Sequence, residues 1–475
     1  MLFAGLSCAE KTPATIADLA CKDCNVLLIT VDALRADALP CYGGKKEVGS
    51  RICSLAENGI LFERAHTFAP LTWPALDAIM TGATLSNESW EGCLAALVDR
   101  PSLAELLGKR GYATAAFTAH PALDLMPDDR MRASSPIRRG FDVFRVVAPL
   151  QPSKEPTSKL LSAEASAWLE QNRGRRFFLW THFFDTHAPY LSYGAYEKSM
   201  KHGPDACGDP RILSGTINSG VASPREVGCL RHLYLAAASD VDEHVGRILD
   251  TLAELGLDDR TMIILTADHG EELMEHGGME HGDHLFEEAI RVPLLVRTPS
   301  TAKRAQGRVR EIASTPSIFK MVLDATGGRC PVIPLGTAVS RTFRPGVCES
   351  VADDTRGITC FSHSPSLPGS KAGAPKGPIF VFPQATDQSQ RDDFALVKGD
   401  VKVILPEGNP DRAEGRDLFR DPGERRRLPA LRELRDDLLK WIVDNRIAPK
   451  PSAEARRLAK EREEQMKALG YIKSK

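Results

Sequence analysis

The sequence predicts an α/β fold in which helices cover both faces of a large, mostly parallel sheet. The first observation is a series of short, continuously apolar runs, which are typical of strands that are buried on both faces. Stretches with a helical spacing of apolar residues separate these runs. The expected strands span residues 26–31, 112–117, 176–184, 262–267 and 292–296.

A small antiparallel sheet and a helix are expected near the C-terminus. Pro, Gly and Ser accumulate through residues 330–377 and predict long irregular connections. Residues 394–405 then alternate like an antiparallel hairpin around Gly399, and apolar residues at helical spacing follow between Leu431 and Ile442. We therefore expect a tether or signal remnant at 1–24, a main domain at 25–330, a smaller subdomain at 331–450 and a charged helix at 451–475.

Two helices in the main domain can be predicted from their ends and faces. Ser102 and Glu105 form a capping box that starts a helix leading to Gly111. The stretch 233–255 carries one apolar stripe and predicts an amphipathic helix.

The overall charge and composition exclude two classes of protein. Lys and Arg number 61 against 63 Asp and Glu, a formal charge of -2, which gives no electrostatic case for nucleic acid. The hydrophobic fraction of 42% and charged fraction of 26% are those of an ordinary globular protein. No apolar run approaches the roughly 20 residues that a transmembrane helix needs.

The cysteines favour an oxidising compartment, because eleven is a high count and several lie in loop-like contexts. Cys21 and Cys24 have no second pair with which to bind zinc, so a disulfide or two thiols is expected. The apolar start, residues 1–8, is too short for a signal peptide but could be the end of one, which would make Cys8 a candidate lipid anchor. Gly5 and Leu6 fit that anchor pattern badly. We expect a periplasmic or extracellular protein, or a membrane-anchored lipoprotein.

Three candidate metal ligands follow expected strands. Asp32 ends the run 26–31, and Asp268 and His269 end the run 262–267. The carboxyl ends of parallel strands line the ligand crevice of an open α/β sheet. Two carboxylates and an imidazole suit zinc or manganese better than calcium. The alternative is that Asp32 and Asp268 merely cap the helices that follow.

Thr72 is the candidate nucleophile. It precedes Trp73, Pro74 and an apolar helical run, which places it at a helix N-terminus, where orphan N–H groups favour a developing oxyanion. A metal on the same oxygen would lower the pKa of the hydroxyl. The alternative is that Thr72 is simply the N-cap of this helix.

The chain resembles the sulfatase family of the alkaline-phosphatase superfamily. The resemblance is carried, in order, by NVLLITVDALRADALPCYGG at 25–44, the TWP turn at 72–74 with TG at 81–82, FFLWTHFFDTHAPY at 177–190, TADHGEELMEHG at 266–277, HLFEEAIRVPLLV at 284–296 and DLFRDPGERRRL at 417–428. It implies an alkaline-phosphatase-like sandwich with one catalytic centre that hydrolyses sulfate, phosphate or phosphonate esters.

The resemblance also implies roles for individual residues. The family's metal ligands, for one divalent ion (Zn, Mn or Ca), correspond to Asp32, Asp268 and His269, with Thr72 at the nucleophile position. His187 and His281 correspond to residues that contact the substrate anion or protonate the leaving group. We add two candidates for substrate binding, Arg35 and His120. His182 is expected to be structural, because alternation along a strand directs it to the face opposite His187.

This chain departs from the family at its nucleophile turn. Sulfatases carry two Asp residues after the first strand, where this chain has Asp32 and Ala33, and Leu76 replaces the Arg of their turn. Their Cys or Ser is oxidised to formylglycine, whereas oxidation of Thr72 would give a ketone.

Some relatives in the superfamily that use Thr at the metal are similar to this chain in their set of metal-binding residues. Lipoteichoic acid synthases and phosphoethanolamine transferases use an acidic residue, Thr, Asp and His, but carry transmembrane helices. A hydrolase or a transferase acting on small-molecule, glycan or lipid esters is therefore expected. The alternative is a non-catalytic, sulfatase-shaped binding protein.

Overall fold

The computed structural model describes residues 21, 23–83, 100–124, 135–147, 156–190, 223–282, 284–299, 306–327, 379–381, 394–398, 400–406, 410–445, 457 and 460. Among them, no helix has the length and apolar character needed to span a bilayer. The boundary expected at residue 24 directly precedes β1, those expected at 330 and 450 lie outside the described residues, and all three stay predictions.

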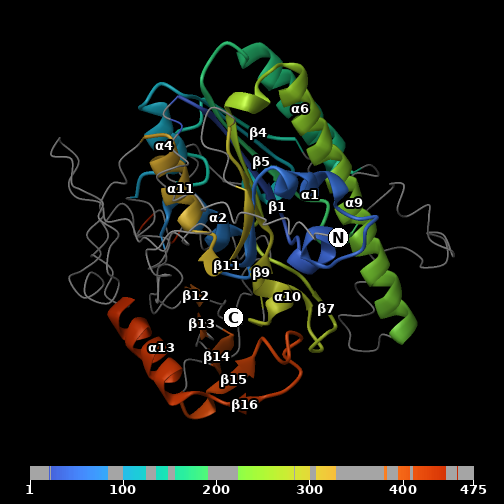
Figure 1. Cartoon of the computed structure of the whole chain (residues 1–475), viewed down its shortest axis with the longest axis vertical. Helices are drawn as coiled ribbons and strands as arrows, with labels where there is room; N and C mark the ends of the chain where they lie inside the picture. Colours follow the sequence, from blue (N-terminus) through green and yellow to red (C-terminus); the bar gives the residue numbers. More distant parts are fainter. Residues whose placement is uncertain are drawn as a thin grey trace, which may run out of the picture.

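A large mixed sheet forms the centre of the molecule (Figure 1). Its strands follow the order β11-β2-β10-β6-β1-β5-β3-β4, and β9 pairs with β2. The neighbours of β1 on both sides, β5 and β6, are parallel to it, while β10 is antiparallel to β6 and β2. The strands are β1 Asn25–Val31, β2 Ile60–His66, β3 Ala113–Thr118, β4 Val143–Val146, β5 Phe177–Phe183, β6 Thr261–Ala267, β9 Arg291–Val292, β10 Leu294–Arg297 and β11 Gly307–Ser314.

Helices cover both faces of this sheet, as predicted. Helices α1, α6 and α9 lie on one side, and α2, α4 and α11 lie on the other (Figure 1). The capping box of Ser102 and Glu105 is present at the start of α4, and a second one, Ser223 with Glu226, starts α9 before the predicted residue. The helices are α1 Ser50–Glu57, α2 Thr72–Thr81, α4 Leu103–Gly108, α6 Thr157–Asn172, α9 Pro224–Glu254, α10 Glu287–Ile290, α11 Ser317–Ala325 and α13 Arg432–Asn445, with short 3-10 turns at Ala36–Ala38, Pro40–Tyr42, Pro121–Asp124, Asp258–Arg260 and Pro410–Arg412.

A second, antiparallel sheet lies near the C-terminal end. Strands β13 and β14 form the predicted hairpin. Leu434 and Leu438 of α13 pack on Leu396, Val403 and Leu405 of the hairpin, so the predicted helix covers this sheet. The strands, in order, are β12 Ile379–Val381, β13 Phe394–Lys398, β14 Val401–Leu405, β15 Glu414–Asp417 and β16 Leu428–Pro429, and a separate pair is β7 Glu272–Leu273 with β8 Met279–Glu280.

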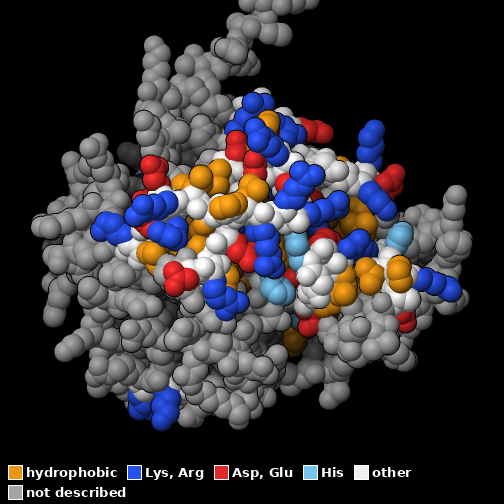
Figure 2. Space-filling view, turned by 90° about the horizontal axis from the view of Figure 1, so that it is seen from below, with side chains coloured by type: hydrophobic (Ala, Val, Ile, Leu, Met, Phe, Trp, Pro, Cys, Tyr) orange, Lys and Arg blue, Asp and Glu red, His pale blue; other side chains and the backbone are white. Residues whose placement is uncertain are grey.

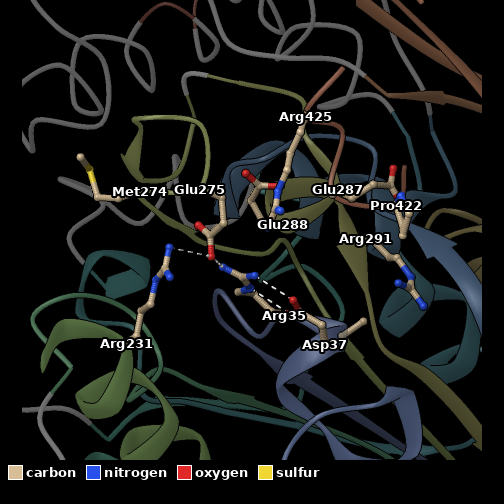
Figure 3. Close-up of a pocket in the computed structure, with 12 residues that line it drawn as sticks. Arg35, Asp37, Arg231, Met274, Glu275, Glu287, Glu288, Arg291, Pro422 and Arg425 are labelled. Carbon is tan, nitrogen blue, oxygen red and sulfur yellow. Dashed lines mark hydrogen bonds and ion pairs between the residues drawn. The ribbon is translucent and has the colours of Figure 1, made fainter. Parts of the chain in front are cut away.

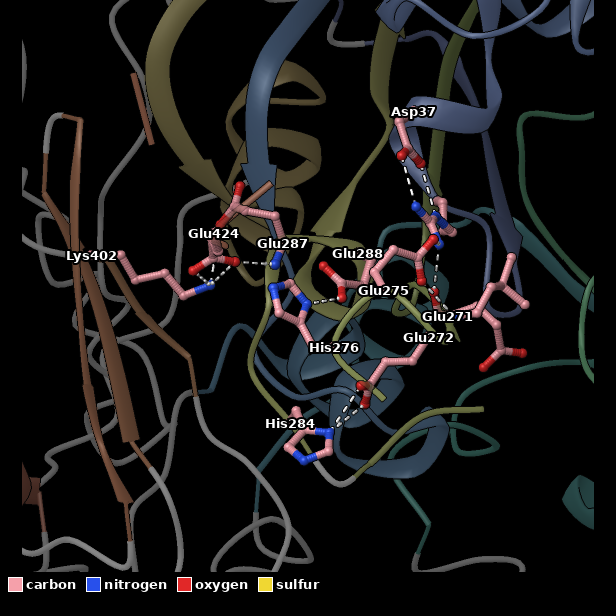
Figure 4. A network of polar contacts seen from close by, with 12 residues as sticks. Asp37, Glu271, Glu272, Glu275, His276, His284, Glu287, Glu288, Lys402 and Glu424 are labelled. Atoms are coloured by element: carbon pink, nitrogen blue, oxygen red, sulfur yellow. Dashed lines mark hydrogen bonds and ion pairs between the residues drawn. The ribbon is translucent and has the colours of Figure 1, made fainter. Parts of the chain in front are cut away.

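A buried ionic network joins the small sheet to the main one (Figure 4). Lys402 of β14 is fully buried, and its ammonium lies 3.0 Å from Glu424 and 3.4 Å from Glu287 of α10. Glu287 also lies 3.2 Å from the imidazole of His66 on β2. Burial alone would raise the pKa of Glu287, but His66 and Lys402 hold that pKa well below its usual value. Glu287 is therefore ionised at neutral pH.

Disulfides are present in the described residues, as predicted. Cys21 pairs with Cys24 ahead of β1, and Cys41 pairs with Cys53 of α1. Disulfides are typical of oxidising compartments, and the periplasmic, extracellular or membrane-anchored location stays a prediction. Cys8, the candidate lipid anchor, lies outside the described residues.

The surface around the small sheet carries mixed charge. Figure 2, seen from the lower end of Figure 1, shows Lys and Arg side chains spread among acidic and hydrophobic ones. This agrees with the near-zero net charge of the whole chain, -2.

Candidate functional site

The register of the central strands brings the predicted ligands to one edge of the sheet. Val31 of β1 pairs with Ala267 of β6, so Asp32 and Asp268 leave their strands at the same level. His182 lies one step deeper, on β5, where it pairs with Thr30 on one side and with Thr118 of β3 on the other. His120 follows β3 by two residues. Because these parallel strands end at the same edge of the sheet, their side chains lie close together there.

Three side chains approach the imidazole Nε2 of His269. The Thr72 hydroxyl lies 3.2 Å from this nitrogen, Asp268 Oδ2 lies 3.5 Å from it, and Asp32 Oδ1 lies 3.7 Å from it. All four residues are fully buried. The structure thus brings together the four residues predicted from the sequence to hold a metal.

The backbone orients Asp268. Ala33 has a left-handed φ of 55°, which is uncommon for a residue with a side chain, and its N–H donates to Asp268 Oδ1 at 3.1 Å. The N–H of His269 donates to the same oxygen at 2.9 Å. Within the described part of the chain, Asp268 Oδ2 and both oxygens of Asp32 accept no hydrogen bond.

The backbone at Gly270 holds the imidazole ring of His269 in place. Its Nδ1 lies 2.8 Å from the carbonyl oxygen of Gly270. A carbonyl only accepts, so Nδ1 carries the hydrogen and Nε2 presents its lone pair to the three oxygens. Gly270 is required here, because a Cβ at this position would lie 2.0 Å from the carbonyl oxygen of Glu288.

The donor set fits a divalent cation. Burial and the neighbouring charge of Asp268 raise the pKa of Asp32 to about 8, so two ionised carboxylates here need a compensating positive charge. Zinc with bonds of roughly 2.0–2.2 Å has ligand atoms about 3.3–3.6 Å apart in a tetrahedron. The contacts around His269 Nε2, at 3.2 to 3.7 Å, are close to that spacing.

Thr72 is the first residue of α2, and the N-cap is Leu71, which makes no side-chain capping bond. The predicted place at a helix N-terminus is confirmed, and the alternative that Thr72 serves as the N-cap is wrong. The Thr72 hydroxyl contacts His269 instead. It therefore lies beside the cation ligands and at the positive end of the helix dipole.

His281 lies next to His269, and His187 lies next to His281. The ring centroid of His281 is 4.1 Å from that of His269 and 4.9 Å from that of His187. Burial and the nearby His187 lower the pKa of His281 to about 3, so its imidazole is neutral at pH 7. His187 is only partly buried, which places it between solvent and the deeper residues.

Glu271 and Tyr190 belong to the site and were not among the predicted residues. Glu271 lies 3.0 Å from His281 Nδ1 and accepts a hydrogen bond of 3.0 Å from the Tyr190 hydroxyl. Burial raises the pKa of Glu271 to about 8. The available signal was its position directly after Gly270, inside the metal-ligand motif.

The expectation that His182 is structural stays a prediction, while its ring lies beside the candidate metal ligand Asp32. His182 Nε2 lies 3.4 Å from Asp32 Oδ2, and His120 Nε2 lies 3.7 Å from the same oxygen. Strand β5 ends at Phe183, and the chain turns before His187. Alternation along the strand therefore does not determine how His187 is directed relative to His182.

Arg35 lies apart from the cation ligands and faces a different cavity (Figure 3). Its guanidinium donates to both oxygens of Asp37, to Glu275 and to the carbonyl of Glu271. Burial alone would lower the pKa of Arg35, but Asp37 and Glu275 keep it well above its usual value. No contact between described residues joins Arg35 to Asp32 or Thr72, so its role in substrate binding stays a prediction.

That cavity has a volume of about 460 Å³ and a lining of mixed charge. Arg35, Arg231, Arg291 and Arg425 line it together with Asp37, Glu275, Glu287 and Glu288. None of the residues around His269 is part of this lining. Because its charges largely offset each other, it does not have the character of an anion site.

Comparisons with known proteins identify the family of the chain. The family model named Sulfatase matches residues 24–328. An ulvan-active sulfatase of Formosa agariphila is 23% identical over 355 residues, which cover 69% of this chain and 66% of that protein. A multifunctional alkaline phosphatase superfamily protein of Trinickia caryophylli is 23% identical over 415 residues, which cover 70% and 78%.

Solved structures share the fold. The phosphonate monoester hydrolase of Agrobacterium radiobacter has a TM-score of 0.60 and 18% identity, over 94% of this chain and 97% of that chain. Since the Sulfatase model covers well over half of the chain, this protein belongs to the sulfatase family of the alkaline-phosphatase superfamily.

Proposed function

We propose that this protein is a metal-dependent ester hydrolase in which Thr72 is the nucleophile. One observation carries the proposal. Three oxygens converge on the lone pair of His269 Nε2, and they belong to Thr72, Asp32 and Asp268. The two carboxylate oxygens among them accept no hydrogen bond from described residues. Buried carboxylates are costly unless they are paired or bind a metal. The arrangement therefore favours a catalytic centre over the alternative of a non-catalytic binding protein.

A divalent cation held by Asp32, Asp268 and His269 would lower the pKa of the Thr72 hydroxyl and offset negative charge on the ester. The deprotonated Thr72 oxygen forms a bond to phosphorus or sulfur, and the bond to the leaving oxygen breaks. The positive end of the α2 dipole, where Thr72 lies, favours the developing negative charge.

His187 and His281 complete the proposed reaction. His281 lies beside His269 and His187 beside His281; His187 can give the leaving oxygen a proton when its imidazole is protonated, whereas neutral His281 can only contact the ester. Water, or a second alcohol in a transfer reaction, then attacks the modified Thr72 and releases the phosphoryl or sulfuryl group.

Thr72 favours phosphorus over sulfur as the centre attacked. A formylglycine hydrate expels sulfate by re-forming its carbonyl, and this requires a second hydroxyl on the β-carbon. Thr72 has one hydroxyl there, so its ester must be cleared by direct attack at the central atom. A phosphoryl group is open to such attack with its charge stabilised by the site. Two compared proteins, one named as a phosphonate monoester hydrolase and one as multifunctional, support phosphonate or phosphate esters as substrates.

A panel of chromogenic esters tests the substrate class. We expect turnover of phosphodiesters or phosphonate monoesters to exceed turnover of sulfate esters of the same alcohol at least about tenfold, because the two differ in how the Thr72 ester is cleared. The measurement is kcat/KM for matched 4-nitrophenyl esters after reloading with zinc or manganese. A preference for the sulfate ester would overturn the choice of phosphorus and favour a sulfatase.

Removing one ligand tests the cation itself. We expect Asp268→Asn to lose binding of one divalent cation per chain, because the neutral amide supplies less charge to a buried centre. Elemental analysis after chelation, reloading and dialysis measures the metal. A matched control is Asp185→Asn, a buried Asp that accepts hydrogen bonds from the first turn of α6 and should leave the metal count unchanged. Equal metal in wild type and Asp268→Asn would contradict the proposal.

A further inference from the structure

One face of the C-terminal sheet packs against the short helix α10. Lys402 and Ile404 are two residues apart on β14, so their side chains point to the same face of that sheet. The ammonium of Lys402 lies 3.4 Å from the carboxylate of Glu287, the first residue of α10 (Figure 4). Ile404 belongs to a buried apolar cluster with three residues in and beside α10, which are Leu285, Ala289 and Ile290. The sheet therefore holds α10 by one ionic contact and one apolar contact.

Glu424 strengthens the ionic contact at the start of α10. The backbone N–H of Glu287 donates to Glu424 Oε2 at 2.6 Å. The Lys402 ammonium lies 3.0 Å from the same Glu424 carboxylate, and both of these residues are buried. Glu424 thus links Lys402 to the backbone of α10 as well as to its side chain.

The backbone of α10 in turn holds the residues that directly follow the candidate metal ligands. The N–H of Gly270 donates to the carbonyl oxygen of Ala289 at 2.8 Å, and the N–H of Glu271 donates to that of Glu288 at 2.9 Å. The carbonyl of Gly270 accepts from His269 Nδ1 at 2.8 Å. That carbonyl and the N–H of Glu271 belong to one peptide group. The peptide group that α10 holds is therefore the one that orients the imidazole of His269.

The same peptide group supports His281. The carboxylate of Glu271 lies 3.0 Å from His281 Nδ1, so the ring of His281 depends on where the backbone of Glu271 lies. The side chain of Glu288 also holds the segment between these residues, since its Oε1 lies 2.5 Å from His276 Nδ1 (Figure 4). Helix α10 therefore contacts the chain at several points between His269 and His281.

We propose that Lys402 and Ile404 are positioning residues, through which the C-terminal sheet holds α10 and thereby the imidazole of His269. The inference rests on the proposed function, because it gives these two residues a part in binding the cation. The rival explanation is that β6 alone positions the ligands, since Asp268 and His269 directly follow its last residue, Ala267. The two explanations differ in whether contacts on the C-terminal sheet affect the metal centre.

Hydrogen exchange in the metal-free, full-length protein tests the effect on the backbone. We expect the amides of Gly270 and Glu271 to exchange at least about tenfold faster in Lys402→Met and in Ile404→Ala, because loss of a contact on α10 makes local opening more frequent. Mass spectrometry of overlapping peptides measures the exchange, and β3 is the internal reference that should stay unchanged. Thermal unfolding checks that each variant folds. The two variants remove different contacts, so a folded Ile404→Ala suffices if Lys402→Met does not fold.

Zinc affinity tests the step from the backbone to the metal ligand. We expect the zinc dissociation constant, measured by competition with a chelator, to rise about tenfold or more in both variants, as is typical when a group that supports a metal ligand is lost. The matched control is Asp242→Ala, which removes a buried carboxylate that accepts from the N–H groups of Arg51 and Ile52 in α1. This control destabilises a different part of the fold and should change neither the exchange at Gly270 nor the dissociation constant.

The outcomes separate this inference from the proposed function. Wild-type exchange at Gly270 and Glu271 in a folded variant would overturn the inference and favour positioning by β6 alone. Faster exchange with an unchanged zinc dissociation constant would also overturn it, as would equal changes in Asp242→Ala. A wild type that binds no divalent cation would instead contradict the proposed function, and the exchange rates would still decide whether Lys402 and Ile404 position this backbone.

Discussion

Replacing Thr72 with Ala is expected to reduce kcat/KM for the best ester substrate by roughly 10³-fold or more, because no other group stands in for a lost nucleophile. Thr72 is fully buried, and its hydroxyl contacts His269. The change to Ala removes that oxygen and one methyl while preserving the helix, since Ala is a good helix former. The measurement is steady-state hydrolysis by metal-loaded protein.

Thr72→Ser is the matched variant, because it keeps the attacking oxygen and loses only the methyl. We expect it to retain activity within about tenfold of wild type. Metal content should be measured on both variants, so that loss of the nucleophile is separated from loss of the cation. Activity in Thr72→Ala comparable to wild type would mean that the nucleophile has been misplaced.

Replacing Lys402 with Met is expected to lower the free energy of unfolding by about 3–5 kcal/mol. Lys402 is fully buried, and its ammonium serves both Glu424 and Glu287 (Figure 4). Without it these carboxylates face each other in a buried environment. Because the pKa of Glu287 is lowered in the folded protein, the contribution of Glu287 is present at neutral pH and is lost as the pH falls below about 4.3.

Chemical denaturation at pH 7 measures this effect. The exposed Lys109→Met is a control with the same substitution and should change stability by about 0.5 kcal/mol or less. Adding Glu424→Gln to Lys402→Met should recover part of the loss, because one uncompensated charge is removed. A loss in Lys402→Met no greater than that in Lys109→Met would contradict the structural importance of the network.

The sequence predicts the strands of the central sheet well and those at its edges poorly. β1, β3, β5 and β6 are continuous apolar runs with both faces buried, so their sequences carry a strong signal. In β2, Glu63 and Arg64 interrupt the run, and no strand was predicted there. The run 292–296 forms β9 and β10, and β10 is antiparallel to β6, because an apolar run does not encode strand direction.

The residues of the candidate site also differ in how well the sequence predicts their positions. Asp32, Asp268 and His269 could be predicted because they end strands, and strand ends meet at one edge of a parallel sheet. The position of His182 beside Asp32 could not be predicted, since it depends on where β5 stops and on the neighbouring Thr30 and Trp180. The departure at Leu76 has a structural consequence. Leu76 is fully buried in the main core, so it leaves no polar group where sulfatases place Arg.

The central claim, that Thr72 forms a covalent bond to the substrate, is tested most directly by quenching the enzyme during turnover. Acid quench at several times with a phosphodiester or phosphonate ester, followed by proteolysis and mass spectrometry, reports which side chain carries the transferred group. The account predicts an added phosphoryl or phosphonyl mass on Thr72 that appears within one turnover and is absent in Thr72→Ala. Modification of another side chain, or turnover with Thr72 unmodified at every quench time, would contradict it.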